Sequence, residues 1–144
     1  MPREYSVYTI LPLYLIRKEG GKFRGRTRLQ KLVFLVQKEM NDAFDYGFKP
    51  AQQGPLSYKL YQRMQNLEAL DLVKELEGTT HSGNLVFRYE LTAEGKSFLN
   101  YAIQNNLLPS EVKSAADRIL EEYGTLPYVE LLNKVHSDHP AYVK

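Results

Sequence analysis

The sequence of 144 residues contains no cysteine. Without cysteine, the chain has no disulfide framework, no thiolate zinc site and no cysteine nucleophile. A long hydrophobic run is missing as well, because the longest one, residues 8–16, is interrupted by Pro12 and falls short of the roughly 18 residues that a membrane-spanning helix requires. Both absences fit the reducing cytoplasm, and we expect a cytoplasmic protein with no membrane partner.

The composition is that of an ordinary globular protein, with 43% hydrophobic and 25% charged residues. A chain of this length can bury one proper core, and the scaling of surface with volume leaves little room for two. The sequence shows no internal repeat and no low-complexity stretch that would divide it. We therefore expect residues 1–144 to form a single domain.

Charge is distributed unevenly along the chain, although the formal net charge is only +2. Residues 1–66 contain 12 Lys and Arg against 5 Asp and Glu, whereas residues 67–144 contain 7 against 12. A protein that meets a polyanion with one face benefits from such segregation, although chance can also produce it. The asymmetry favours a nucleic acid as the partner.

Helical periodicity and helix-breaking residues delimit the first two helices. Apolar residues recur on one face over residues 5–18, and two consecutive glycines then end the segment. Pro12 marks either a kink in this helix or its true first turn. Thr27 and Gln30 form a Thr-x-x-Gln capping box, in which each side chain can bond to a free amide of the first turn. This box predicts a second helix that continues to about Asn41.

A third helix and two strands are predicted next. Ser57 follows a loop rich in glycine and proline and is placed to cap a helix that reaches about Leu70. Residues 72–76 and 85–91 have the composition of strands, and the second of them alternates between apolar and polar residues. The segment between them, residues 78–84, consists of small and polar residues and predicts a hairpin loop.

Residues 92–144 predict a helical extension. Thr92 and Ser110 are placed to cap a fourth and a fifth helix, Gly124 ends the fifth, and residues 126–135 form a short sixth. These last two helices carry apolar stripes, which consist of Val112, Ala116, Ile119, Leu120, Tyr123, Leu131, Leu132 and Val135. The stripes must be buried, either in an enlarged core of one chain or against a symmetric partner, and we expect a homodimer.

The order of three helices, a two-stranded hairpin and further helices resembles that of a winged helix-turn-helix domain. Several segments also resemble that superfamily in sequence, and they are residues 26–35, 54–57, 67–73, 89–95 and 123–142. Together they look most like a group of archaeal and bacterial winged-helix proteins related to Panacea and antitoxin-type domains. Members often carry a Tyr-Pro-Glu-Tyr type sequence near the end, from which His139 and Ala141 depart. The resemblance implies a mostly helical α+β fold, with a winged-helix core over residues 5–91 and a helical extension over residues 92–144.

The resemblance also implies that the third helix enters the major groove of double-stranded DNA while the hairpin touches the neighbouring backbone or minor groove. Arg, Gln and Asn are the residue types that pair with base edges, whereas Lys and Tyr suit phosphate contacts. The candidate DNA contacts on this helix and on the hairpin are Ser57, Tyr58, Lys59, Gln62, Arg63, Asn66, His81 and Arg88. A DNA-binding regulator of transcription is the function that we expect.

A basic cluster precedes and begins the second helix, with five cations in ten residues and no acidic residue between them: Lys22, Arg24, Arg26, Arg28 and Lys31. The dipole at a helix N-terminus adds to the attraction of such a cluster for phosphate. A solvated run of charges is the alternative interpretation. If the cluster binds DNA, six cations should lie on one face of the molecule, and they are Lys22, Arg24, Arg26, Arg28, Lys59 and Arg63.

Other functions stay open beside DNA binding. The hairpin loop contributes only His81 as a possible cation, and winged helices also serve as protein-interaction modules, of an antitoxin-like or chaperone-recruiting kind. His136 and His139 lack a third ligand at metal-binding spacing, so surface histidines are the preferred interpretation. The sequence shows neither a glycine-rich phosphate loop after a strand nor a recognisable catalytic triad. We expect no cofactor, no metal and no enzymatic activity.

Overall fold

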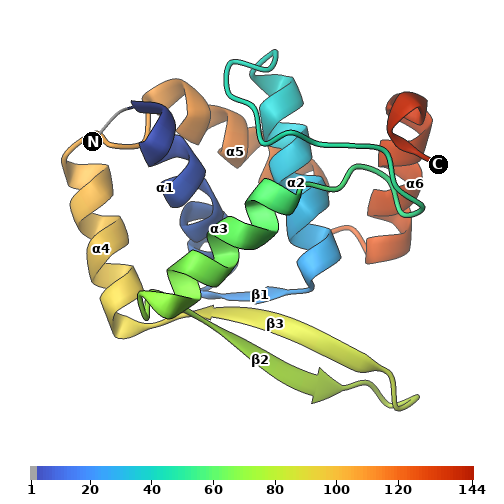
Figure 1. The fold of residues 1–144 in the computed structure, drawn as a ribbon, viewed down its shortest axis with the longest axis horizontal. Helices are drawn as coiled ribbons and strands as arrows, with labels where there is room; N and C mark the ends of the chain where they lie inside the picture. Colours follow the sequence, from blue (N-terminus) through green and yellow to red (C-terminus); the bar gives the residue numbers. More distant parts are fainter. Residues whose placement is uncertain (1–2) are drawn as a thin grey trace.

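The computed structural model describes residues 3–144, without the side chains of residues 3–6 and of Lys22. In this range the chain is α+β and mostly helical, with six α-helices, one three-stranded antiparallel sheet and a final 3-10 turn (Figure 1). The elements are α1 (Arg3–Lys18), β1 (Lys22–Arg24), α2 (Arg26–Glu39), α3 (Tyr58–Ala69), β2 (Val73–Thr79), β3 (Leu85–Leu91), α4 (Ala93–Gln104), α5 (Ser110–Tyr123), α6 (Tyr128–Asp138) and η1 (Pro140–Tyr142).

The sheet has one strand more than the sequence predicted. Its order is β1-β3-β2, so the hairpin of β2 and β3 is completed by β1 on the other side of β3. Phe23 of β1 lies opposite Tyr89 of β3, and both side chains are buried. A strand of three residues is too short for alternation to be recognised in a sequence, which explains why β1 was missed. The far end of the hairpin projects beyond the helices (Figure 1).

The core is one cluster of buried side chains that extends from Val7 to Val135 and includes residues of all six α-helices and all three strands. Helix α2 lies at its centre, because every residue from Leu29 to Gln37 is buried. Pro12 lies inside α1, so this helix passes through the proline and does not begin there. Within the described part of the chain, no helix is long and apolar enough to cross a membrane.

The capping signals were only partly correct. Ser57 and Thr92 cap α3 and α4 as predicted, since their side chains accept hydrogen bonds from the backbone N–H groups of Leu60 and Gly95 at 3.0 and 2.9 Å. The Thr27 capping box is wrong. Helix α2 begins two residues earlier than this box predicts, at Arg26, and its N-cap residue is Gly25, with a φ of 94°. The N-cap residue of α5 is Pro109 and not the predicted Ser110, and α6 begins at Tyr128, two residues after the predicted start.

The apolar stripes of α5 and α6 are covered within the chain itself. Helix α5 packs against α1 and α2, and α6 packs against α2. Six of the eight stripe residues are buried, namely Val112, Ala116, Ile119, Tyr123, Leu131 and Val135. The argument for a homodimer through these helices therefore no longer applies, because the surface that was to be shared with a partner faces the protein's own core.

Lys31 does not belong to the surface cluster in which the sequence placed it. Its side chain is only 1% exposed, and its Nζ donates a hydrogen bond to the carbonyl oxygen of Pro55 at 3.3 Å. Burial lowers the pKa of Lys31 to about 8. The cause is the central position of α2, since the loop before α3 and helix α6 cover the side of the helix that carries Lys31. A phosphate group therefore has no access to it.

We expect Lys31→Met to raise the free energy of unfolding at neutral pH by about 2 kcal/mol, because the cation is desolvated on folding and an apolar side chain is not. Between pH 8 and its ordinary pKa of 10.5, Lys31 binds a proton only in the unfolded chain, so the stability of the wild type rises with pH in that window. The advantage of the variant should therefore shrink from pH 8 to pH 10. Urea unfolding at several pH values measures both effects.

Lys134→Met is the matched control, since Lys134 is exposed on α6 and its replacement should change the stability by less than about 0.5 kcal/mol. A Lys31→Met variant that is less stable than the wild type, or equally more stable at every pH, would contradict the buried position of this amine.

Candidate nucleic-acid interface

The start of α3 is fixed by Ser57, which was predicted to lie near DNA. Ser57 is 0% exposed, and its hydroxyl donates to the carbonyl oxygen of Tyr46 at 2.5 Å while it accepts the N–H of Leu60. The residue is therefore a buried helix cap and cannot contact a ligand. Its role is to fix where α3 begins.

Gln30 of α2 binds the backbone of Ser57 on both sides. Its side-chain Nε2 donates to the carbonyl oxygen of Ser57 at 2.9 Å, and its Oε1 accepts the N–H of Ser57 at 2.8 Å. Gln30 is 1% exposed, so neither bond competes with water. The amide thus holds the first residue of α3 against α2, which explains why Gln30 does not take part in the expected capping box.

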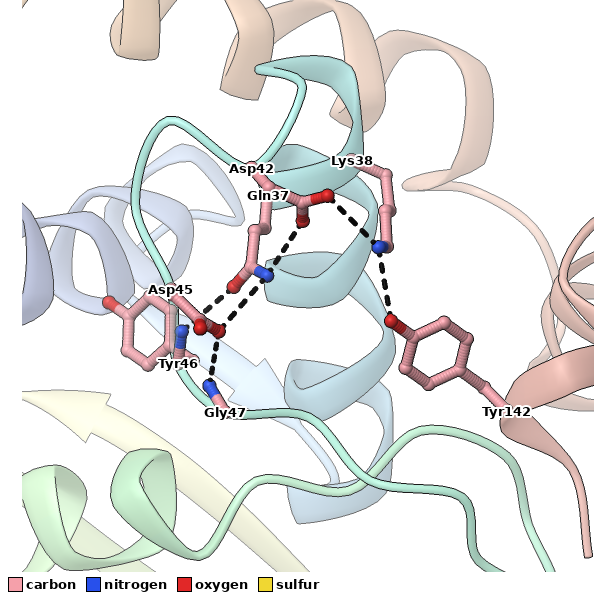
Figure 2. A network of polar contacts seen from close by, with 7 residues as sticks. All are labelled: Gln37, Lys38, Asp42, Asp45, Tyr46, Gly47 and Tyr142. Carbon is pink, nitrogen blue, oxygen red and sulfur yellow. Dashed lines mark hydrogen bonds and ion pairs between the residues drawn. The ribbon is translucent and has the colours of Figure 1, made fainter.

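The loop that leads from α2 to α3 is held by a second polar network (Figure 2). The Gln37 side chain accepts the N–H of Tyr46 and donates to Asp42, both at 2.9 Å. Lys38 Nζ donates to the carboxylate of Asp42 at 3.2 Å and to the hydroxyl oxygen of Tyr142, in η1, at 3.1 Å. The bond from Gln37, together with the charge of Lys38, lowers the pKa of Asp42. Both ends of the loop are therefore tied to α2, and the chain end is tied to the same network.

The outer face of α3, as we call the side of this helix opposite its buried residues, is rich in amides and is bordered by the exposed charges of Lys59 and Glu68. Leu60, Met64 and Leu67 point into the core. The exposed residues on the opposite side of the helix are Tyr58, Gln62, Gln65, Asn66 and Ala69. Among the described contacts, none of these five side chains forms a hydrogen bond or an ion pair within the chain. Tyr58 is 70% exposed. The outer face is therefore free to bind a ligand.

Two residues of the outer face, Gln65 and Ala69, were not among the predicted contacts. Gln65 follows Gln62 by three positions, and residues at that spacing lie on the same side of a helix. The spacing could have identified it from the sequence.

One flank of the outer face is an ion pair between α2 and β2. The Arg26 guanidinium binds the Glu75 carboxylate through two nitrogens, with its Nε at 2.8 Å, and lies 3.8 Å from the centre of the Phe87 ring. This bond lowers the pKa of Glu75, and burial raises the pKa of Tyr89 beside it. A pocket of about 240 Å³ lies here between α3 and the sheet, lined by Arg26, Tyr61, Met64, Gln65, Glu68, Glu75 and Tyr89.

The other flank faces α1 and the loop. Lys59 Nζ lies 3.7 Å from the centre of the Tyr8 ring and donates to the carbonyl oxygen of Asp45 at 3.2 Å. Arg63 Nη1 donates to the hydroxyl of Thr9 in α1 at 3.3 Å. Arg63 is therefore turned toward α1 and only partly exposed, whereas the sequence predicted an outward-facing side chain that contacts a base.

The predicted basic cluster does not form one surface. Arg24 lies opposite Arg88 in the sheet, and both are exposed on the side away from Phe23 and Tyr89. Arg26 binds Glu75 on the other side of the sheet, and Arg28 donates to the carbonyl oxygens of Gly124 and Leu126, before α6. His81 is exposed in the hairpin loop, and the side chain of Lys22 lies outside the described residues. The expectation of a single basic face is therefore wrong.

Comparison with known proteins gives no family for this chain. No protein-family model matches the sequence, and a search of curated proteins finds no match either.

We expect Gln30→Ala to lower the free energy of unfolding by about 3 kcal/mol, because it leaves the buried N–H of Ser57 without a partner and removes a second buried hydrogen bond. Gln62→Ala is the matched control, since it removes an exposed amide from α3 and should change the stability by less than about 0.5 kcal/mol. Urea unfolding of both variants measures the difference. Equal effects of the two substitutions would mean that the Gln30 bonds contribute nothing to the seating of α3.

Proposed function

We propose that this chain is a winged-helix protein that binds double-stranded DNA through the outer face of α3 and acts as a regulator of transcription. The observation that carries the proposal is the outer face itself. It presents three side-chain amides, those of Gln62, Gln65 and Asn66, to solvent with no partner inside the described chain. Amides are polar groups that pair with base edges in the major groove.

The arrangement of elements supports the proposal. Helix α3 follows α2 through a loop and is followed directly by the hairpin of β2 and β3, which extends past it (Figure 1). With β1 added to the sheet, the order of elements is similar to that of a winged-helix domain, in which the corresponding helix enters the major groove. A helix with its side chains is about 10–12 Å wide, which fits the groove's width of about 12 Å.

The rigidity of α3 supports it further. Side chains that recognise bases need a helix that is already in position, because the entropy lost in ordering the helix on binding would lower the affinity. The Ser57 cap and the two Gln30 bonds hold the start of α3, and Leu60, Met64 and Leu67 hold its inner side. None of these groups lies on the outer face, so binding does not have to disturb them.

Electrostatics contributes less than the sequence led us to expect. Arg26, Lys59 and Arg63 flank the outer face, and each already contacts a protein group. At most these three cations would neutralise phosphates beside α3. Counterion release then accounts for a small part of the affinity, and base contacts for a larger part.

We expect the chain to bind its preferred duplex with a weak dependence on salt. With about three phosphates neutralised, the slope of log K against log salt concentration should be near −3. Fluorescence anisotropy of a labelled duplex between about 50 and about 200 mM salt measures the slope. Lys59→Ala should lower the magnitude of the slope by about one, whereas Lys134→Ala, on exposed α6, should leave it unchanged.

The absence of binding to any duplex, including a fully randomised pool at the lowest salt concentration, would overturn the proposal. That result would favour a protein-interaction module. One observation supports this alternative: Leu70, at the end of α3, is 66% exposed, and Tyr58, at the start of the helix, is exposed as well.

A further inference from the structure

We infer that α3 recognises a short run of A·T base pairs through Gln62, Gln65 and Asn66 and makes no guanine contact from its outer face. This inference rests on the proposed function, since it assigns the base preference of the same surface. It follows from which side chains the fold leaves exposed on α3 and which it engages elsewhere.

The three amides form one continuous patch. Gln65 and Asn66 follow Gln62 by three and four positions, so all three side chains project from adjacent turns of the same side of the helix. With a rise of about 1.5 Å per residue, Gln62 and Asn66 are about 6 Å apart along the axis. Stacked base pairs are about 3.4 Å apart, so the patch spans about two base-pair steps.

The chemistry of an amide selects adenine among the base edges of the major groove. The side-chain oxygen accepts a hydrogen bond from the N6 amino group, and the side-chain nitrogen donates one to N7. Both atoms must be free for this bidentate contact, and in the described chain none of the three amides forms a hydrogen bond. Gln30 shows the opposite case, since both of its side-chain polar atoms are used by Ser57.

Guanine recognition would need an arginine or a lysine on the same face, because those side chains donate to O6 and N7. The three cations nearest to the outer face lie on its flanks, where Arg26 binds Glu75, Arg63 binds Thr9 and Lys59 lies over Tyr8. Ala69 extends the patch by one turn, and its methyl group suits contact with the 5-methyl group of thymine. The face therefore offers partners for both bases of an A·T pair.

Selection from a pool of randomised duplexes tests the inference directly. We expect the wild type to enrich sites with a core of two or three consecutive A·T pairs. Replacing adenine in that core by 7-deazaadenine removes the N7 acceptor and leaves Watson–Crick pairing intact. It should weaken binding by between about fivefold and about a hundredfold at a contacted position.

Matched variants assign the effect to the amides. Asn66→Ala should reduce the preference for the selected site over random duplex by at least about fivefold, whereas Asn133→Ala, which removes an exposed amide from α6, should leave the preference unchanged. Gln65→Arg introduces a guanine-binding side chain and should shift one position of the selected core to G·C.

The possible failures are distinguishable. Absence of binding to every duplex at low salt overturns the DNA-binding proposal as a whole. Binding with a selected core of G·C pairs, with no selected core, or with no response to 7-deazaadenine overturns the A·T inference and leaves DNA binding standing.

Discussion

The position of α3 depends on the pair of buried hydrogen bonds between the Gln30 side chain and the backbone of Ser57. They join α2, which lies at the centre of the core, to the first residue of a helix whose outer face is otherwise exposed. The Ser57 hydroxyl extends the link in two directions, to the N–H of Leu60 and to the carbonyl oxygen of Tyr46. These bonds add a fixed point at the start of the helix to the packing of Leu60, Met64 and Leu67 on its inner side.

The groups that hold α3 in position are different from the side chains that its outer face exposes to solvent. Charges near α3 are used within the chain, by the Arg26 and Glu75 pair on one side and by the contacts of Lys59 and Arg63 on the other. The side chains that remain exposed between them are neutral amides, whose hydrogen-bonding groups are directional. Such a surface discriminates between partners by geometry, whereas a basic patch would attract any polyanion.

The sequence predicted the features that depend on local spacing. The Ser57 and Thr92 caps and the pairing of the two hairpin strands follow from patterns within a few residues, and the structure confirms them. The sequence could not predict that Lys31 is buried or that Arg63 contacts α1, because a helical pattern does not tell which other elements cover the polar side of a helix. The predicted role of Gln30 was wrong for the same reason. Its partner Ser57 is 27 residues away, whereas a capping box considers only neighbours within one helical turn.

The most direct test of the account is a titration of isotopically labelled protein with a duplex of the selected sequence, followed by NMR of the side-chain amide groups. These signals report on the outer face itself. If α3 is the binding surface, the NH₂ resonances of Gln62, Gln65 and Asn66 shift on binding, while those of Gln104 and Asn133, exposed on α4 and α6, stay in place. Unchanged resonances on α3 together with shifts on α4 or α6 would contradict the assignment of α3 as the binding surface.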